Sequence, residues 1–118
     1  MKIKNFIEDN NTRFVAWIFN EQNIRKIFLN EIQALPFKNL EKILIIGFNG
    51  TREKAVIYNG EGSVKCKIVN PDPTAAGFGD VYYVNNELTL INRWKGDSLM
   101  KACVIDEDGK VIRVYETR

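Results

Sequence analysis

The side chains of this sequence that could do chemistry are carboxylates, lysines, arginines, tyrosines and two cysteines, because its 118 residues include no histidine. Without histidine, the chain lacks the usual general base and the usual metal ligand near neutral pH. Serine–histidine and cysteine–histidine nucleophile pairs are excluded, and two cysteines cannot complete a common catalytic zinc site. We therefore expect no enzymatic activity, no metal site and no cofactor.

Two segments resemble ligand-binding loops but lack their key residues. Gly47–Lys54 follows an apolar run, yet it has no Gly-Lys-Ser/Thr ending, and a strand rather than a helix is expected after it. Asp106–Gly109 is acidic, but a calcium loop needs glycine and glutamate where Val111 and Thr117 stand. Both segments are expected to be hairpin turns.

A carboxylate-based site stays open as an alternative. A small fold with a helix on a curved sheet can enclose a cone-shaped pocket that works with Asp and Tyr and without histidine. The tyrosines alternate with carboxylates along the expected strands: Tyr58, Tyr82, Tyr83 and Tyr115. Aromatic rings packed on a sheet face beside solvated charges explain the same pattern. The alternative function is thus a small-ligand-binding or carboxylate-dependent enzyme domain.

Two segments carry residues that the packing of a core does not readily explain. They are the loop Asn70–Asp80 and a strand end where Trp94 stands among charged residues. In the loop, Phe78 stands between two glycines. Exposed aromatic residues surrounded by polar ones suit a protein-binding surface, and Asp72 and Asp80 could pair with basic groups of a partner. These four residues are the predicted partner-binding residues, unless the two aromatic side chains fold back into the core.

The elements that would position these residues begin with a predicted helix. Residues 21–35 carry apolar side chains at helical spacing, so we expect one amphipathic helix there, ended by Pro36. Residues 13–19 are β-branched and aromatic, which favours a strand, but they also extend the helical stripe. Asn20 followed by Glu21 would serve as a helix cap.

After Pro36 the pattern favours β-structure. Lys42–Phe48 is a continuous apolar run, typical of a central strand covered on both faces, so Ile45 is expected to be almost fully buried. The further expected strands are residues 53–58, 63–69, 81–84, 87–93, 98–106 and 110–116. The predicted fold is a single α+β domain over residues 1–118, with one main amphipathic helix packed on an antiparallel sheet of six or seven strands.

A short residue pattern recurs in the expected strands, and we call this repetition the echo. Lys54 leads to Gly62, and Lys101 leads to Gly109 at the same spacing 47 residues later. Two similar hairpins explain the echo without a duplication. Residues 81–115 also have the texture of a propeller blade, but a propeller needs at least four blades of roughly 40 residues each. We therefore expect one meandering sheet.

Charge and hydropathy restrict the partners and the compartment. The 17 basic and 15 acidic residues are interleaved and give a net charge of +2, whereas nucleic-acid modules concentrate basic charge on one face. No apolar run approaches the roughly 18 residues of a membrane span, and no secretory signal is found at the N-terminus. We expect a cytoplasmic protein without nucleic-acid or membrane partners, in which Cys66 and Cys103 are reduced and buried.

In its length, its cytoplasmic character and its expected α+β pattern, the chain resembles the single-domain immunity proteins of bacterial toxin systems, such as contact-dependent growth inhibition. The resemblance implies a small cytoplasmic protein that binds one cognate toxin domain and blocks it. Inhibitors of nuclease toxins are often acidic, so the net charge of +2 speaks against a nuclease partner. Besides the ligand-binding or enzyme domain, a structural or phage-type subunit is the remaining alternative.

Overall fold

The computed structural model describes residues 2–9, 13–70, 77–92 and 100–117, which form eleven β-strands in three antiparallel sheets. The N-terminal sheet consists of β1 (Lys4–Asp9), β2 (Phe14–Phe19) and β3 (Gln22–Ile27). The central sheet consists of β4 (Gln33–Pro36), β5 (Lys42–Ile46), β6 (Lys54–Asn59) and β7 (Val64–Val69). The C-terminal sheet consists of β8 (Phe78–Val84), β9 (Glu87–Asn92), β10 (Met100–Ile105) and β11 (Val111–Thr117).

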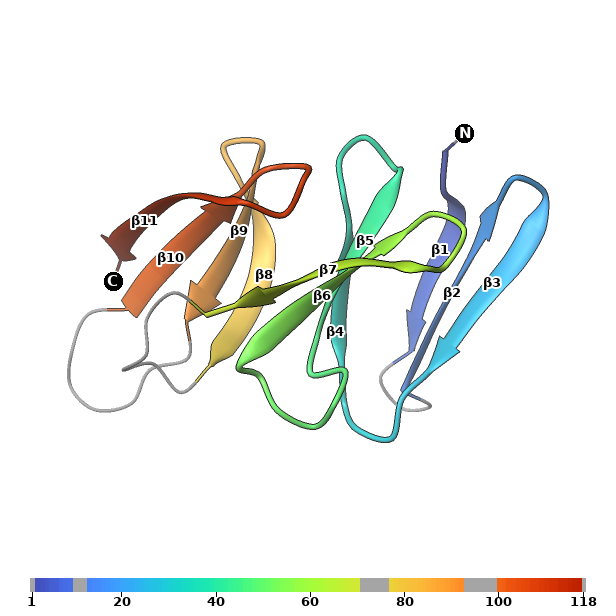
Figure 1. Ribbon diagram of the computed structural model, residues 1–118, viewed down its shortest axis with the longest axis horizontal. Coiled ribbons are helices and arrows are strands. Elements are labelled where there is room, and N and C mark those ends of the chain that lie inside the picture. The colour runs from blue at the N-terminus through green and yellow to red at the C-terminus, as the bar shows by residue number, and fades with distance from the viewer. Residues whose placement is uncertain (1, 10–12, 71–76, 93–99, 118) are drawn as a thin grey trace.

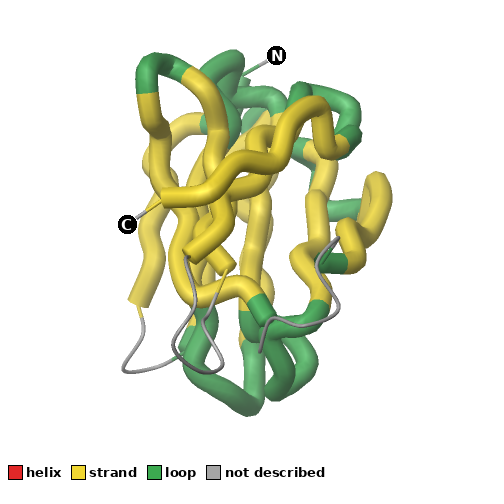
Figure 2. Tube along the Cα trace, turned by 90° about the vertical axis from the view of Figure 1, so that its left-hand side faces the viewer, coloured by secondary structure: helices red, strands yellow, loops and turns green. Residues whose placement is uncertain are grey.

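The three sheets stand face to face, with the central sheet between the other two (Figure 1). Within each sheet, strands that follow one another in the sequence are neighbours, so each sheet is a meander. The strands run between two sets of connections at opposite ends of the stack (Figure 2). Strand β4 contacts β8 on one side and β1 on the other, and the Ala34 amide donates to Glu8 Oε2 over 2.8 Å. The stack measures 47 Å along its longest axis.

The predicted α+β fold is wrong, because the described residues contain no helix. None of them can therefore belong to a helix long and apolar enough to cross a bilayer. The expectation of one sheet with six or seven strands is also wrong, since the strands divide into sheets of three, four and four. Residues 21–35, predicted as the main helix, contain β3, a connection and β4 instead.

The turn between β2 and β3 accounts for this difference. Asn20 and Glu21 both have positive φ, at 51° and 63°, and the residues on either side of them, Phe19 and Gln22, pair across the hairpin. Two-residue loops of this kind match the right-handed twist of paired strands. The dipeptide expected to cap a helix is therefore a hairpin turn, and residues 13–19, left open between strand and helix, contain strand β2.

Helical spacing was misleading in β3 because its apolar residues lie on opposite faces. Ile24 packs toward the core between the N-terminal and central sheets, whereas Ile27 is 70% exposed on the other face. A helix would have placed these two side chains on one stripe. The strand ending at Pro36 is an edge strand of the central sheet, where the missing proline N–H costs no ladder hydrogen bond.

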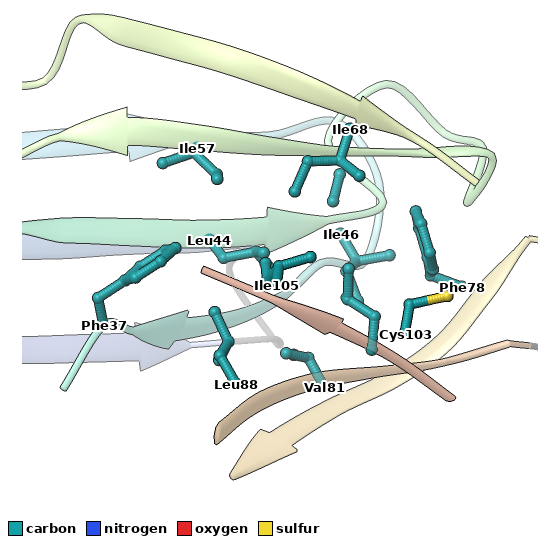
Figure 3. Packing of buried hydrophobic residues seen from close by; sticks show 12 residues of the cluster. Phe37, Leu44, Ile46, Ile57, Ile68, Phe78, Val81, Leu88, Cys103 and Ile105 are labelled. Atoms are coloured by element: carbon teal, nitrogen blue, oxygen red, sulfur yellow. The ribbon is translucent and has the colours of Figure 1, made fainter. Parts of the chain in front are cut away.

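The central sheet is buried on both faces, as the apolar run over residues 42–48 predicts. Ile43 and Ile45 pack in the core shared with the N-terminal sheet, while Leu44 and Ile46 pack in the core shared with the C-terminal sheet. All four side chains are 0% exposed, so the predicted burial of Ile45 is confirmed. Figure 3 shows the second of these cores and labels ten of its twelve buried residues: Phe37, Leu44, Ile46, Ile57, Ile68, Phe78, Val81, Leu88, Cys103 and Ile105.

The 47-residue echo corresponds to two hairpins of the same design, as expected. In the β6–β7 turn, the Gly62 amide donates to the Asn59 carbonyl over 2.9 Å. In the β10–β11 turn, the Gly109 amide donates to the Asp106 carbonyl over 3.1 Å. Both glycines have positive φ, at 101° and 86°, and in both hairpins the pairing register shifts once near the turn.

The tip of each hairpin packs on the sheet that precedes it in the chain. The Trp17 indole N–H of the N-terminal sheet donates to the Gly60 carbonyl over 2.6 Å. In the same way, Cys66 Sγ of the central sheet lies 3.8 Å from the Asp108 carbonyl oxygen. The repeated contact holds successive sheets in similar relation to one another.

Candidate protein-binding site

The connections that carry the predicted partner-binding residues attach to one end of the stack. Strand β8 begins at Phe78 and β9 ends at Asn92, and these two residues pair in the β8–β9 ladder. Phe78 and Asn92 therefore lie next to each other at one end of the C-terminal sheet. We call this end the loop end and define it by the described residues 28–33, 47–53 and 77–80 (Figure 1).

Arg52 fastens the start of β8 to the central sheet. Its Nε donates to the Phe78 carbonyl over 2.6 Å, and its Nη2 donates to the Gly79 carbonyl over 3.1 Å. In return, the Phe78 amide donates to the Arg52 carbonyl over 2.6 Å. The same Nη2 lies 3.1 Å from Gln33 Oε1. One guanidinium thus joins a turn of the central sheet, strand β4 and the first residues of β8.

The backbone approaches so closely here that glycine is required at position 77. Gly77 has a φ of 110°, and a Cβ atom at this position would lie 2.5 Å from the Arg52 carbonyl oxygen. A few residues earlier, the Asn70 amide donates to the Glu53 carbonyl over 3.0 Å. Both ends of the predicted binding loop are therefore fixed to the turn between β5 and β6.

Of the four predicted partner-binding residues, two lie within the described part of the chain. Asp80 is exposed, and its Oδ1 accepts hydrogen bonds from the Gln33 side-chain amide and from the Val81 backbone amide. Phe78 is 0% exposed and packs between the central and C-terminal sheets, so its side chain acts as a core residue in this structure. Asp72 and Trp94 lie outside the described residues, and their role stays a prediction.

Gln33 and Arg52 orient this end, and no local sequence pattern indicates either residue. Arg52 lies in the segment examined as a phosphate loop, where the pattern predicts only a hairpin turn. Gln33 lies in the segment predicted as a helix, and only the strand assignment places it beside Asp80. Local spacing cannot reveal a contact that depends on how two sheets stack.

Three titratable side chains near a cavity at the opposite end form structural bonds: Tyr83, Glu87 and Asp106. Glu107 also lines this cavity. This cavity, of about 210 Å³, lies between the central and C-terminal sheets. The Tyr83 hydroxyl donates to the Pro36 carbonyl over 3.0 Å, and burial raises the pKa of Tyr83. Asp106 Oδ1 accepts from the backbone amides of its own turn, and Glu87 forms an ion pair with Arg113 at 2.5 Å. Tyr83, Glu87 and Asp106 thus each contribute to structural contacts at this end.

Within the ranges that the structure describes, no three or more Cys, Asp or Glu side chains are grouped so that they could hold a metal ion. Cys66 and Cys103 form no disulfide, and Cys103 is buried as expected, whereas Cys66 is only half-buried. Each belongs to a different sheet, and each packs with apolar neighbours. The described cysteines therefore contribute to the core.

Comparison with known proteins shows a shared fold. No family model matches the sequence, and no curated protein matches it. Among solved structures, the chain is similar to a chain of the structure of Tne2 in complex with Tni2, with a TM-score of 0.64 and 15% sequence identity. The similarity covers 89% of this chain and 77% of that chain. At this identity it shows that the two chains fold alike.

Proposed function

We propose that this chain is a cytoplasmic immunity protein that binds one cognate toxin domain and blocks it, as in contact-dependent growth inhibition. The fold supports this proposal, because a chain of similar fold belongs to a solved complex of two proteins. The size of the chain supports it as well, since one small domain of 118 residues suits a protein whose task is to cover a single site.

The observation that carries the proposal is the construction of the loop end. The predicted loop over residues 70–80 is too long, because Phe78 to Asp80 belong to β8. Asn70 and Phe78 are both fixed to one turn, and the Asp80 carboxylate is exposed but held by two hydrogen bonds. A carboxylate held in advance loses little conformational freedom when a partner binds. Charged groups of this kind steer association with a partner of opposite charge. On this proposal, Asp80 and Asp72 meet basic groups of the toxin domain, and Trp94 adds apolar contact.

Affinity purification from the native host tests the proposal. A tagged chain should recover a second protein in equimolar amount, and co-expression of the chain should protect cells against that protein. The Glu41→Lys variant serves as a control, because Glu41 is exposed on the β4–β5 connection at the end opposite the loop end. Recovery of a small molecule instead, or of a protein whose toxicity the chain leaves unchanged, would contradict the proposal and favour the ligand-binding alternative.

A further inference from the structure

The middle strand of the N-terminal sheet carries apolar side chains on both faces. Val15 and Trp17 of β2 point toward the central sheet and are 0% and 1% exposed. Phe14, Ala16 and Ile18 alternate with them and point to the opposite side, which we call the outer face. A strand that is apolar on both faces is typical of a sheet covered on both sides, as β5 is in the central sheet.

No described element covers the outer face. The N-terminal sheet stands at one end of the stack, and no other described strand lies beyond it (Figure 1). Ile7 is paired with Ala16 and is 55% exposed, and Ile27 is paired with Phe14 and is 70% exposed. The residues that line an open groove of about 390 Å³ on this sheet are Asn5, Ile7, Ala16, Trp17, Ile18, Asn23, Ile24 and Arg25.

The charged residue among those that line this groove is basic. Arg25 lines it, and the guanidinium carbon lies 4.5 Å from the centre of the Phe14 ring. Lys4 is exposed and is paired with Ile18. Among the acidic residues that the same sheet carries outside the groove lining, Asp9 is paired with Phe14 at the other end of β1, and Glu21 lies in the β2–β3 turn. The chemistry that fits this surface is an apolar segment that carries a carboxylate.

The size of the outer face argues against a second copy of this chain as its occupant. Three strands spaced about 4.8 Å apart, with six residues rising about 3.3 Å each, give a face of roughly 14 by 20 Å. A stable interface buries about 800 Å² on each partner, so this face can supply only part of one. Beyond Ile27, the 88% exposed side chain of Leu29 continues the apolar surface into the loop end.

We propose that the outer face is a second contact surface for the protein partner, whose apolar segment enters the groove and places a carboxylate beside Arg25. This inference rests on the proposed function for the identity of the partner. The loop end and the outer face then form one continuous interface through Ile27 and Leu29. The apolar anchor of the interface is supplied by these residues and Ile18, because Phe78 is buried in the core.

Photo-cross-linking and charge reversal test this inference in the full chain. A benzoylphenylalanine at position 18, and separately at position 80, should cross-link to the same protein in the native host. The purified Arg25→Glu variant should bind that protein about tenfold more weakly or worse, and reversing a carboxylate at the cross-linked site of the partner should restore binding. Ile18→Asp should have a similar effect, while Val64→Asp on the exposed edge of β7 should have none.

Each outcome separates this inference from the proposed function. If Arg25→Glu binds the partner with unchanged affinity, the outer-face contact is overturned, whether or not Ile18→Asp folds. The toxin-binding proposal still stands in that case if position 80 cross-links to the partner. A cross-link from position 18 to a second copy of the chain also overturns the outer-face contact. Another outcome is a partner that cross-links to position 18 and binds Arg25→Glu more weakly, while the chain leaves its activity unblocked. That result supports the outer-face contact and contradicts the immunity function.

Discussion

Phe78 shows how a single residue can have either of two roles that the sequence cannot separate. Its position between two glycines predicts an exposed contact residue in a loop, or else a residue that folds back into the core. In the structure it is the first residue of β8, and its ring is fully buried between two sheets. The glycine on its N-terminal side serves the close approach to Arg52.

We therefore expect Phe78→Ala to destabilise the fold by about 3–5 kcal/mol, the usual cost of removing a buried aromatic ring and leaving a cavity. Urea-induced unfolding of the purified variant measures this loss directly. Phe78→Leu is the control and should cost clearly less, because most of the buried volume is kept. A Phe78→Ala variant that unfolds at the parent's urea concentration would show that this ring does not belong to the core.

Tyr83 gives a prediction about pH. Burial, together with the negative charge of Glu107, raises the pKa of Tyr83 above its ordinary value of 10.0. The folded state thus favours the protonated phenol. The contribution of Tyr83 to the free energy of unfolding is fully present below pH 10, and it is lost as the pH rises through the higher pKa of the folded state. Tyr83→Phe removes the hydrogen bond to the Pro36 carbonyl, so it should lower the free energy of unfolding by about 0.5–1.5 kcal/mol at neutral pH.

The measurement is the unfolding free energy of both proteins between pH 7 and about pH 11. The difference between the parent and Tyr83→Phe should stay constant up to about pH 9 and shrink above pH 10, because only the parent can ionise this side chain. A difference that grows with pH would mean that the Tyr83 phenolate is stabilised in the folded protein.

At the scale of elements, the two-residue turns decide which strands exist. Asn85 and Asn86 join β8 to β9 with φ angles of 50° and 65°, as Asn20 and Glu21 join β2 to β3. Asparagine tolerates positive φ, whereas glutamate is strained there. Glu21→Gly should therefore stabilise the protein by roughly 0.5–1 kcal/mol.

Thermal unfolding of Glu21→Gly tests this assignment, and Glu41→Gly is the matched control, because no positive φ is found at Glu41. The control should be neutral or slightly destabilised, since glycine enlarges the freedom of the unfolded chain. Destabilisation of Glu21→Gly to the same extent as the control would contradict the hairpin turn and reopen the helical interpretation of residues 21–35.

The sequence predicted the strands after Pro36 well because they rely on local signals. The apolar run of β5, the alternation in β7 and the glycine turns are each read from a few neighbouring residues. The N-terminal third could not be read in this way. Its apolar residues fit the spacing of a helix and that of a strand. The strands form because a turn without glycine joins β2 to β3 and because the central sheet covers one face of the N-terminal sheet. Propensity is a weak prior when packing supplies most of the stability.

At the scale of the whole molecule, the sheets form a stack in which the central sheet lies between the other two. The central sheet supplies residues to both cores and anchors the loop end through Arg52 and Gln33. Neither relation was visible in the sequence, because the division into three sheets depends on contacts between distant strands. The loop and its charges stay predicted partner contacts, and the sequence patterns did not indicate the residues that fasten the described ends of the loop.

The central claim is that this chain binds a protein through the loop end, and the association rate constant with the recovered partner tests it most directly. Asp80→Lys should slow association about tenfold, because a steering carboxylate becomes a repelling ammonium. Asp80→Asn keeps the oxygen that accepts from Gln33 and Val81, so it should slow association less and melt with the parent. Glu41→Lys, at the opposite end, should associate at the parent's rate. Equal rate constants for the parent, Asp80→Lys and Glu41→Lys would contradict the claim.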